Sequence, residues 1–161
     1  VDAAAVFKAA DIARQALTVV SEHVDRGCRS ALRLLEDSDR DYAYVLNARK
    51  RFLGVVSSQS LRDALQGHSG MLGLKHAFLP DVQPLSSTTP VAELFGPVAA
   101  QPFALPVVDD DGKYLGVVSR TTMLKFLDRD TPPVPPPQKE IPTITLNTQA
   151  TAPASATPSQ Q

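Results

Sequence analysis

The stretch "YLGVVSRTTML" at residues 114–124 decides the fold, because "FLGVVSSQSL" at residues 52–61 has the same pattern 62 residues earlier. With this offset the chain aligns with itself, without a gap, over residues 28–65 and 90–127. Clustered identities of this kind indicate one supersecondary unit that occurs twice. The identical pairs include Leu32/Leu94, Val45/Val107, Leu53/Leu115, Gly54/Gly116, Val55/Val117, Val56/Val118, Ser57/Ser119 and Leu65/Leu127.

Each copy predicts the same order of elements: a helix, a strand, a polar turn, a second strand and a second helix. Short extended segments at 18–20 and 80–87 lead into the copies. In the second copy, Thr89 and Pro90 are candidates for the N-cap and first residue of a helix, and Pro106 should lie at the start or open side of its strand. The elements are expected at 30–37, 42–46, 47–50, 51–57 and 60–66, and at 90–100, 104–108, 109–112, 113–119 and 121–128.

The repeated glycine and serine have a physical explanation. Gly54 and Gly116 lie within strands, where a Cβ would cause a steric clash if another backbone or a ligand approaches closely. Ser57 and Ser119 end these strands, and their hydroxyl groups can cap the helices that follow. A unit of about 60 residues buries a small share of its surface. We therefore expect the two copies to pack sheet to sheet around one core.

The composition limits the classes of function. The chain has 161 residues, 43% of them hydrophobic, and a formal net charge of −1, so it has no basic excess for binding nucleic acid. No apolar run is long enough to span a bilayer, and no signal peptide is visible. The single Cys28 excludes an internal disulfide and fits a reducing, cytoplasmic setting as an apolar filler. Because the chain starts with Val1, we expect it to be a piece of a longer protein.

The sequence does not predict an enzyme. A phosphate-binding loop of the G-x-x-x-x-G-K-[ST] type is absent, so this segment should not hydrolyse ATP. The three histidines lack the spacing of metal ligands. We therefore expect no catalytic residues and no metal site.

The two copies resemble a known family. The stretch "ALPVVDDDGKYLGVVSRTTML" (104–124) resembles a CBS domain, and two such domains in tandem resemble a Bateman module. A narrower resemblance links the chain to the C-terminal regulatory region of the ATP-binding subunit of glycine betaine/proline-type osmoprotectant ABC transporters. It rests on "AAVFKAADIAR" (4–14), "RSALRLLEDSDRDYAYVL" (29–46) and "AQPFALPVVDDDGKYLGVVS" (100–119).

This resemblance implies an α/β (α+β) fold. Two CBS repeats, each helix-strand-strand-helix, would pack sheet to sheet with pseudo-two-fold symmetry. We expect residues 1–66 to form the first repeat with its N-terminal lead-in, 67–79 a linker and 80–130 the second repeat. Residues 131–161, rich in Pro, Thr, Ala and Ser, should form a disordered tail.

The resemblance also implies a function. The chain would be the regulatory module of an osmoprotectant transporter (glycine betaine, L-proline or choline type), sensing ionic strength or a small ligand. Its partners would be its own ATPase domain, the permease, a second copy of the module and an anionic membrane surface. It would lie in the cytoplasm at the inner face of the plasma membrane. Two alternatives are an adenine-nucleotide sensor that regulates another partner and a purely structural dimerisation module.

The resemblance further implies where a ligand would bind. Family members often hold adenine nucleotides between the repeats, so an adenine nucleotide or a cyclic dinucleotide is a candidate ligand, and the resemblance fixes no cofactor. The hydroxyl position is matched by Ser57 and Ser119, but the acidic position is occupied by Ser60 and Thr122, which departs from the family pattern. With Arg120, these residues are the candidate contacts; alternatively, both hydroxyls are only helix caps.

Ionic-strength sensing has its own candidates. The first polar turn carries Arg49, Lys50 and Arg51, and the second carries acidic residues at 109–111. Salt screens exposed charges, since the Debye length falls from about 10 Å at 0.1 M to roughly 3 Å at 1 M. A basic turn could therefore form a salt-sensitive latch with anionic lipid or within a dimer. The alternative is that hairpin turns are exposed and usually charged.

Overall fold

The computed structural model of the chain describes residues 3–21 and 27–130. Residues 131–161, for which the sequence predicts a disordered tail, lie outside the described residues.

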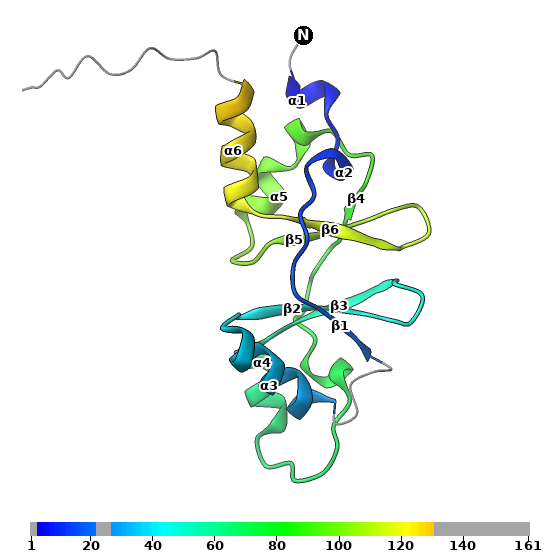
Figure 1. The fold of residues 1–161 in the computed structure, drawn as a ribbon, viewed down its shortest axis with the longest axis vertical. Helices are drawn as coiled ribbons and strands as arrows, with labels where there is room; N and C mark the ends of the chain where they lie inside the picture. The colour runs from blue at the N-terminus through cyan, green and yellow to red at the C-terminus, as the bar shows by residue number, and fades with distance from the viewer. Residues whose placement is uncertain (1–2, 22–26, 131–161) are drawn as a thin grey trace, which may run out of the picture. The chain divides into compact units, whose positions relative to one another are not determined.

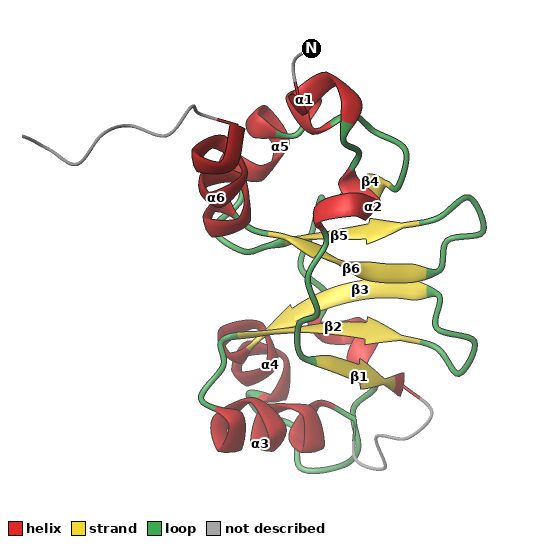
Figure 2. Ribbon diagram, turned by 45° about the horizontal axis from the view of Figure 1, so that its top comes forward, coloured by secondary structure: helices red, strands yellow, loops and turns green. Residues whose placement is uncertain are grey.

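Two three-stranded sheets form the centre of the fold, and both have the same topology (Figures 1 and 2). In each sheet the first strand pairs in parallel with the second, which forms an antiparallel hairpin with the third. The pairs Val45↔Gly54 and Val107↔Gly116 have the same register, and each is followed by the same irregularity. The strands are β1 (Thr18–Val20), β2 (Tyr42–Leu46), β3 (Phe52–Ser57), β4 (Leu85–Ser86), β5 (Leu105–Val108) and β6 (Tyr114–Val118).

Helices cover one side of each sheet, and the hairpins of the two sheets lie next to each other (Figure 2). The helices α3 (Cys28–Ser38) and α4 (Ser58–Leu65) belong to the first sheet. The helix α6 (Arg120–Asp130) belongs to the second sheet, together with α5 (Phe95–Ala99). The predicted α/β architecture of two helix-strand-strand-helix repeats is thereby confirmed.

One predicted helix is wrong in its extent. Residues 90–100 form a 3₁₀ turn, η3 (Val91–Glu93), followed by the short α5, instead of one helix. Pro97 explains the break, since it has no N–H and its ring clashes with the carbonyl four residues earlier. Thr89 is not a side-chain cap either: Pro90 occupies the N-cap position, without a side-chain hydrogen bond.

The N-terminal segment 3–16, which we call the strap, packs on the second sheet. It contains α1 (Ala3–Val6) and α2 (Ala9–Ile12) and runs into β1 of the first sheet. The N–H of Ala9 donates to the carbonyl of Thr89 at 2.9 Å. The backbone of Arg14 exchanges two hydrogen bonds with Val117, at 2.9 and 2.8 Å. The sequence assigned this segment to the first repeat, whereas the structure places it against the second.

The interior is divided into two apolar clusters, whereas the sequence predicted one shared core. Side chains alternate along a strand, so Val45 and Val56 face the helices of the first repeat, while Tyr44 and Val55 face the other way. The first pair belongs to a cluster built by the first repeat with η2 (Leu74–Ala77). The second pair joins the cluster of the second sheet and the strap.

Cys28 is fully buried at the start of α3, as expected for an apolar filler. Its thiol donates to the carbonyl of Gly73 at 3.4 Å. Burial raises the pKa of the Cys28 thiol above its usual value, which favours the unreactive protonated form.

Candidate functional site

The hydroxyl groups predicted to bind ligand at the first helix start are bonded to each other's backbone. The N–H of Ser60 donates to Oγ of Ser57 at 2.9 Å, and the N–H of Ser57 donates to Oγ of Ser60 at 2.9 Å. This reciprocal arrangement is a capping box at the N-terminus of α4. Ser57 is only 9% exposed, so its hydroxyl acts as a helix cap.

The second helix start is similar. The N–H of Thr122 donates to Oγ of Ser119 at 3.1 Å, and the two hydroxyl oxygens also lie 3.1 Å apart. The guanidinium of Arg120 donates instead to the carbonyls of Ala99 and Gln101, at 2.9 and 3.1 Å. Of these three candidates, Thr122 lines the pocket described next.

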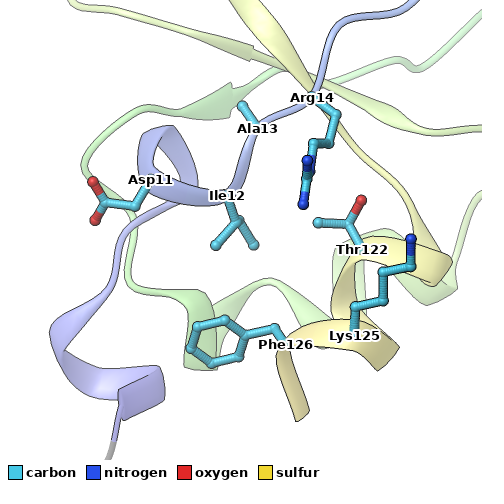
Figure 3. Close-up of a pocket in the computed structure, with 7 residues that line it drawn as sticks. All are labelled: Asp11, Ile12, Ala13, Arg14, Thr122, Lys125 and Phe126. Atoms are coloured by element: carbon cyan, nitrogen blue, oxygen red, sulfur yellow. The ribbon is translucent and has the colours of Figure 1, made fainter. Parts of the chain in front are cut away.

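A pocket of about 320 Å³ lies between the strap and α6 (Figure 3). The polar ends of Arg14, Thr122 and Lys125 are directed toward the same space. Asp11 lies on the far side of Ile12 from Arg14 in this view, and its carboxylate accepts a hydrogen bond from the N–H of Lys8 at 2.9 Å. The lining residues are Asp11, Ile12, Ala13, Arg14, Thr122, Lys125 and Phe126.

Gly116 explains why the strap can lie here. It has φ +150°, and a Cβ built on it would lie 2.8 Å from the carbonyl oxygen of Arg14. The close approach expected from the sequence is therefore made by a backbone. At the corresponding Gly54, a Cβ would lie 2.7 Å from the ring of Phe78, so a side chain occupies the equivalent space.

Sequence reasoning missed Arg14 and Lys125 as site residues. Lys125 follows Thr122 by three positions on a helix, so both share one face, and this signal could have indicated it. Arg14 gave no such signal, because it lies outside the repeat and more than 100 residues from Thr122 in sequence.

The basic and acidic turns lie side by side within the same chain. The N–H of Phe52 donates to the carbonyl of Gly112 at 3.0 Å, and the N–H of Tyr114 donates to the carbonyl of Lys50 at 2.9 Å. A Cβ built on Gly112 would lie 3.8 Å from Nη1 of Arg51, which places this guanidinium against the acidic turn. Opposite charges thus meet where the two sheets are joined by backbone hydrogen bonds.

The turns also have the same internal support. The side-chain oxygen Oδ1 of Asn47 accepts from the N–H groups of Arg49 and Arg51, at 2.9 and 3.0 Å. Oδ1 of Asp109 accepts from the N–H groups two and four residues later, both at 2.9 Å. Both turns are therefore held in shape independently of the exposed side chains at their tips.

Two tyrosines connect the sheets near this contact. The rings of Tyr44 and Tyr114 are stacked with centroids 6.3 Å apart. The hydroxyl of Tyr44 donates to the carbonyl of Ala104 in the second repeat. Burial raises the pKa of both tyrosines above the ordinary value, most strongly for Tyr44.

Within residues 3–21 and 27–130, no group of three His, Cys, Asp or Glu side chains is placed to hold a metal ion. No helix in this part of the chain has the length and apolar character needed to cross a membrane.

Known proteins with a similar sequence or fold identify the class of domain to which this chain belongs. The CBS domain family model matches residues 76–129. The solved structure of CbpB in complex with c-di-AMP superimposes with a TM-score of 0.68 at 15% identity, covering 78% of this chain and 87% of that one. CBSX2 in complex with AMP gives a TM-score of 0.62 at 22% identity, covering 76% of this chain and 97% of that one. The chain therefore has the fold of a pair of CBS domains.

One relative links the chain to a particular group of proteins that contain CBS domains. The chain is 40% identical, over 131 residues, to the glycine betaine/proline betaine transport system ATP-binding protein ProV of Salmonella typhimurium. The match covers 81% of this chain and 32% of ProV. The chain thus spans about a third of the length of that relative, and it is related to ATP-binding subunits of betaine transport systems.

Proposed function

We propose that the chain is a regulatory module of the ATP-binding subunit of an osmoprotectant transporter of the glycine betaine, L-proline or choline type. The observation that supports this most directly is the 40% identity to ProV over 131 residues. In this proposal the chain itself performs no catalysis. It adjusts transport through its own ATPase domain and the permease, at the cytoplasmic face of the plasma membrane, and it pairs with a second copy of itself.

Ionic strength is the signal that we favour, and the turn at Arg49, Lys50 and Arg51 is the proposed sensor. The neighbouring acidic turn at 109–111 gives this basic turn a partner within the chain, in competition with anionic lipid. Salt screens the attraction between exposed charges such as those on these two turns. Rising salt would thus weaken the contact between the turns and change how the two repeats pack.

The test replaces all three basic residues by glutamine in the complete transporter and measures transport against salt concentration. We expect the salt concentration that activates transport to shift. The matched control replaces three exposed basic residues away from the turns, Arg33, Arg40 and Lys75, and should leave it in place. An unchanged threshold in the turn variant would remove the turn from the mechanism. If deleting the whole chain weakens assembly and leaves the salt response intact, the chain is instead a structural dimerisation module.

A small-ligand sensor is the second candidate, supported by the pocket between the strap and α6. Two structures with the same fold contain c-di-AMP and AMP, which is a property of those proteins. Calorimetric titration with AMP, ATP and c-di-AMP tests this candidate. Micromolar binding would support nucleotide sensing. The absence of detectable binding with all three nucleotides would rule this candidate out.

A further inference from the structure

An apolar groove of about 240 Å³ lies between α5 and α6 of the second repeat. Phe95 and Val98 line it from α5, and Met123, Leu124 and Leu127 line it from α6. Two of these side chains are large, apolar and exposed, since Leu124 is 66% and Leu127 is 44% exposed. Apolar side chains that are exposed together at a groove mark a site of interaction with another protein surface.

The first repeat supplies an internal comparison, because its equivalent positions lie 62 residues earlier. Four apolar positions of the groove are charged there, and the ion pair between Arg62 and Glu36, at 3.7 Å, joins two of them. The helical face of the first repeat is therefore polar where that of the second is apolar. The equivalent pairs are Arg33/Phe95, Glu36/Val98, Asp37/Ala99 and Arg62/Leu124.

The charges on α6 are complementary to those of a second copy of the same helix. Arg120, Leu124 and Asp128 follow one another at intervals of four residues, so they form one ridge along the helix. Arg120 and Asp128 lie about 12 Å apart along the axis, which is too far for an ion pair within one helix. If two such ridges run in opposite directions and meet at Leu124, each Arg120 lies beside the Asp128 of the other copy.

The side chain of Arg120 is held in place for this contact. Its two hydrogen bonds, to the carbonyls of Ala99 and Gln101, both come from Nη2. An arginine has five N–H groups, so those on Nη1 and Nε can donate to a carboxylate of another chain. Packing of ridges spaced by four residues is also the commonest way in which two helices cross.

We propose that two copies of the chain associate through this groove, with α6 against α6 in opposite directions. Leu127 of each copy enters the groove of the other, and the Leu124 side chains of both copies meet at the two-fold axis. Since both partners use the same surface, the contact closes as a dimer. A helix of 11 residues is about 16 Å long, so the interface is small and the association is weak and reversible.

This inference rests on the proposed pairing of two copies, and it names the surface that pairs them. Only the second repeat takes part, so the first repeat, which carries the basic turn, stays outside the contact. The salt response of transport is measured separately, so it can fail without affecting this inference.

Sedimentation of the purified chain over a series of concentrations measures the association. We expect an equilibrium between monomer and dimer, and Leu127→Gln should weaken it by about tenfold or more. The matched control is Leu53→Gln in β3, because Leu53 is 43% exposed but does not line the groove. The control should leave the dissociation constant unchanged.

An exchange of charges tests the direction of the two helices. Arg120→Glu and Asp128→Lys should each prevent self-association, because like charges then face each other at both ends of the contact. An equal mixture of these two variants should associate again, since the charges across the contact are once more opposite. Unfolding curves show whether each variant folds. If Arg120→Glu does not fold, Leu127→Gln and Asp128→Lys carry the test.

Unchanged dimerisation in Leu127→Gln, or a mixture of folded charge variants that stays monomeric, would overturn the proposed surface and leave the pairing of copies intact. A chain that stays monomeric at about 1 mM would overturn both. If transport by the complete transporter then changes in Leu127→Gln, the groove binds another part of the transporter instead of a second copy.

Discussion

Gly116 is the residue on which the position of the strap depends most closely. Its φ of +150° and the 2.8 Å approach of the Arg14 carbonyl to a built Cβ leave no room for a side chain. We predict that Gly116→Ala lowers the free energy of unfolding by about 1–3 kcal/mol. Urea unfolding measures this loss.

The matched control for this change is Gly96→Ala in α5, where a Cβ meets nothing within 4 Å. It should be neutral or stabilising by about 0.5–1 kcal/mol, because alanine favours helix over glycine. Equal effects of the two substitutions would show that the strap does not lie on β6 in solution.

Tyr44 links the two repeats and should make the protein sensitive to alkali. Its pKa is raised in the folded state, so the unfolded chain releases the proton first as pH rises. The contribution of Tyr44 is therefore complete below about pH 10, the unfolded value, and is lost above it. We predict a decline in stability above about pH 10 that is shallower in Tyr44→Phe. Urea unfolding from pH 8 to 11 checks this, and identical slopes would contradict it.

At the scale of elements, a substitution at the start of α4 can distinguish whether Ser57 caps the helix or binds a ligand. Ser57 accepts from the N–H of Ser60 and is nearly buried. We predict that Ser57→Ala lowers the free energy of unfolding by about 1 kcal/mol and leaves any binding of AMP unchanged. Ser69→Ala, at an exposed position outside the helices, is the control for chemical denaturation. A loss of binding without a loss of stability would return Ser57 to the ligand site.

At the scale of the whole molecule, the strap at the start of the described chain packs in the same apolar cluster as α6 at its end. Ile12 is 8% exposed in the cluster that it shares with the second sheet, whereas Val6 is 55% exposed. We predict that Ile12→Ala lowers the free energy of unfolding by about 2–4 kcal/mol, while Val6→Ala changes it by less than about 0.5 kcal/mol. Equal effects would mean that the strap is not part of this core.

The candidate site was only partly predictable. Thr122 was named from a family pattern, but the basic partners that define the chemistry of the pocket were not. The sequence shows that one turn is basic and the other acidic, but it does not predict that the two turns lie next to each other. Their contact requires β3 and β6 to lie together, which no local pattern encodes.

The sequence by itself determined the duplicated strand pairs, the turns between them and the serine caps, since each depends on residues within a few positions of one another. Tertiary structure alone decided three features: the strap on the second sheet, the division of the core, and the approach of Arg14 to Lys125. These features depend on contacts between segments far apart in the chain. Such contacts leave no periodic or neighbouring signal, and their energy comes from packing that exists only after the two repeats have folded together.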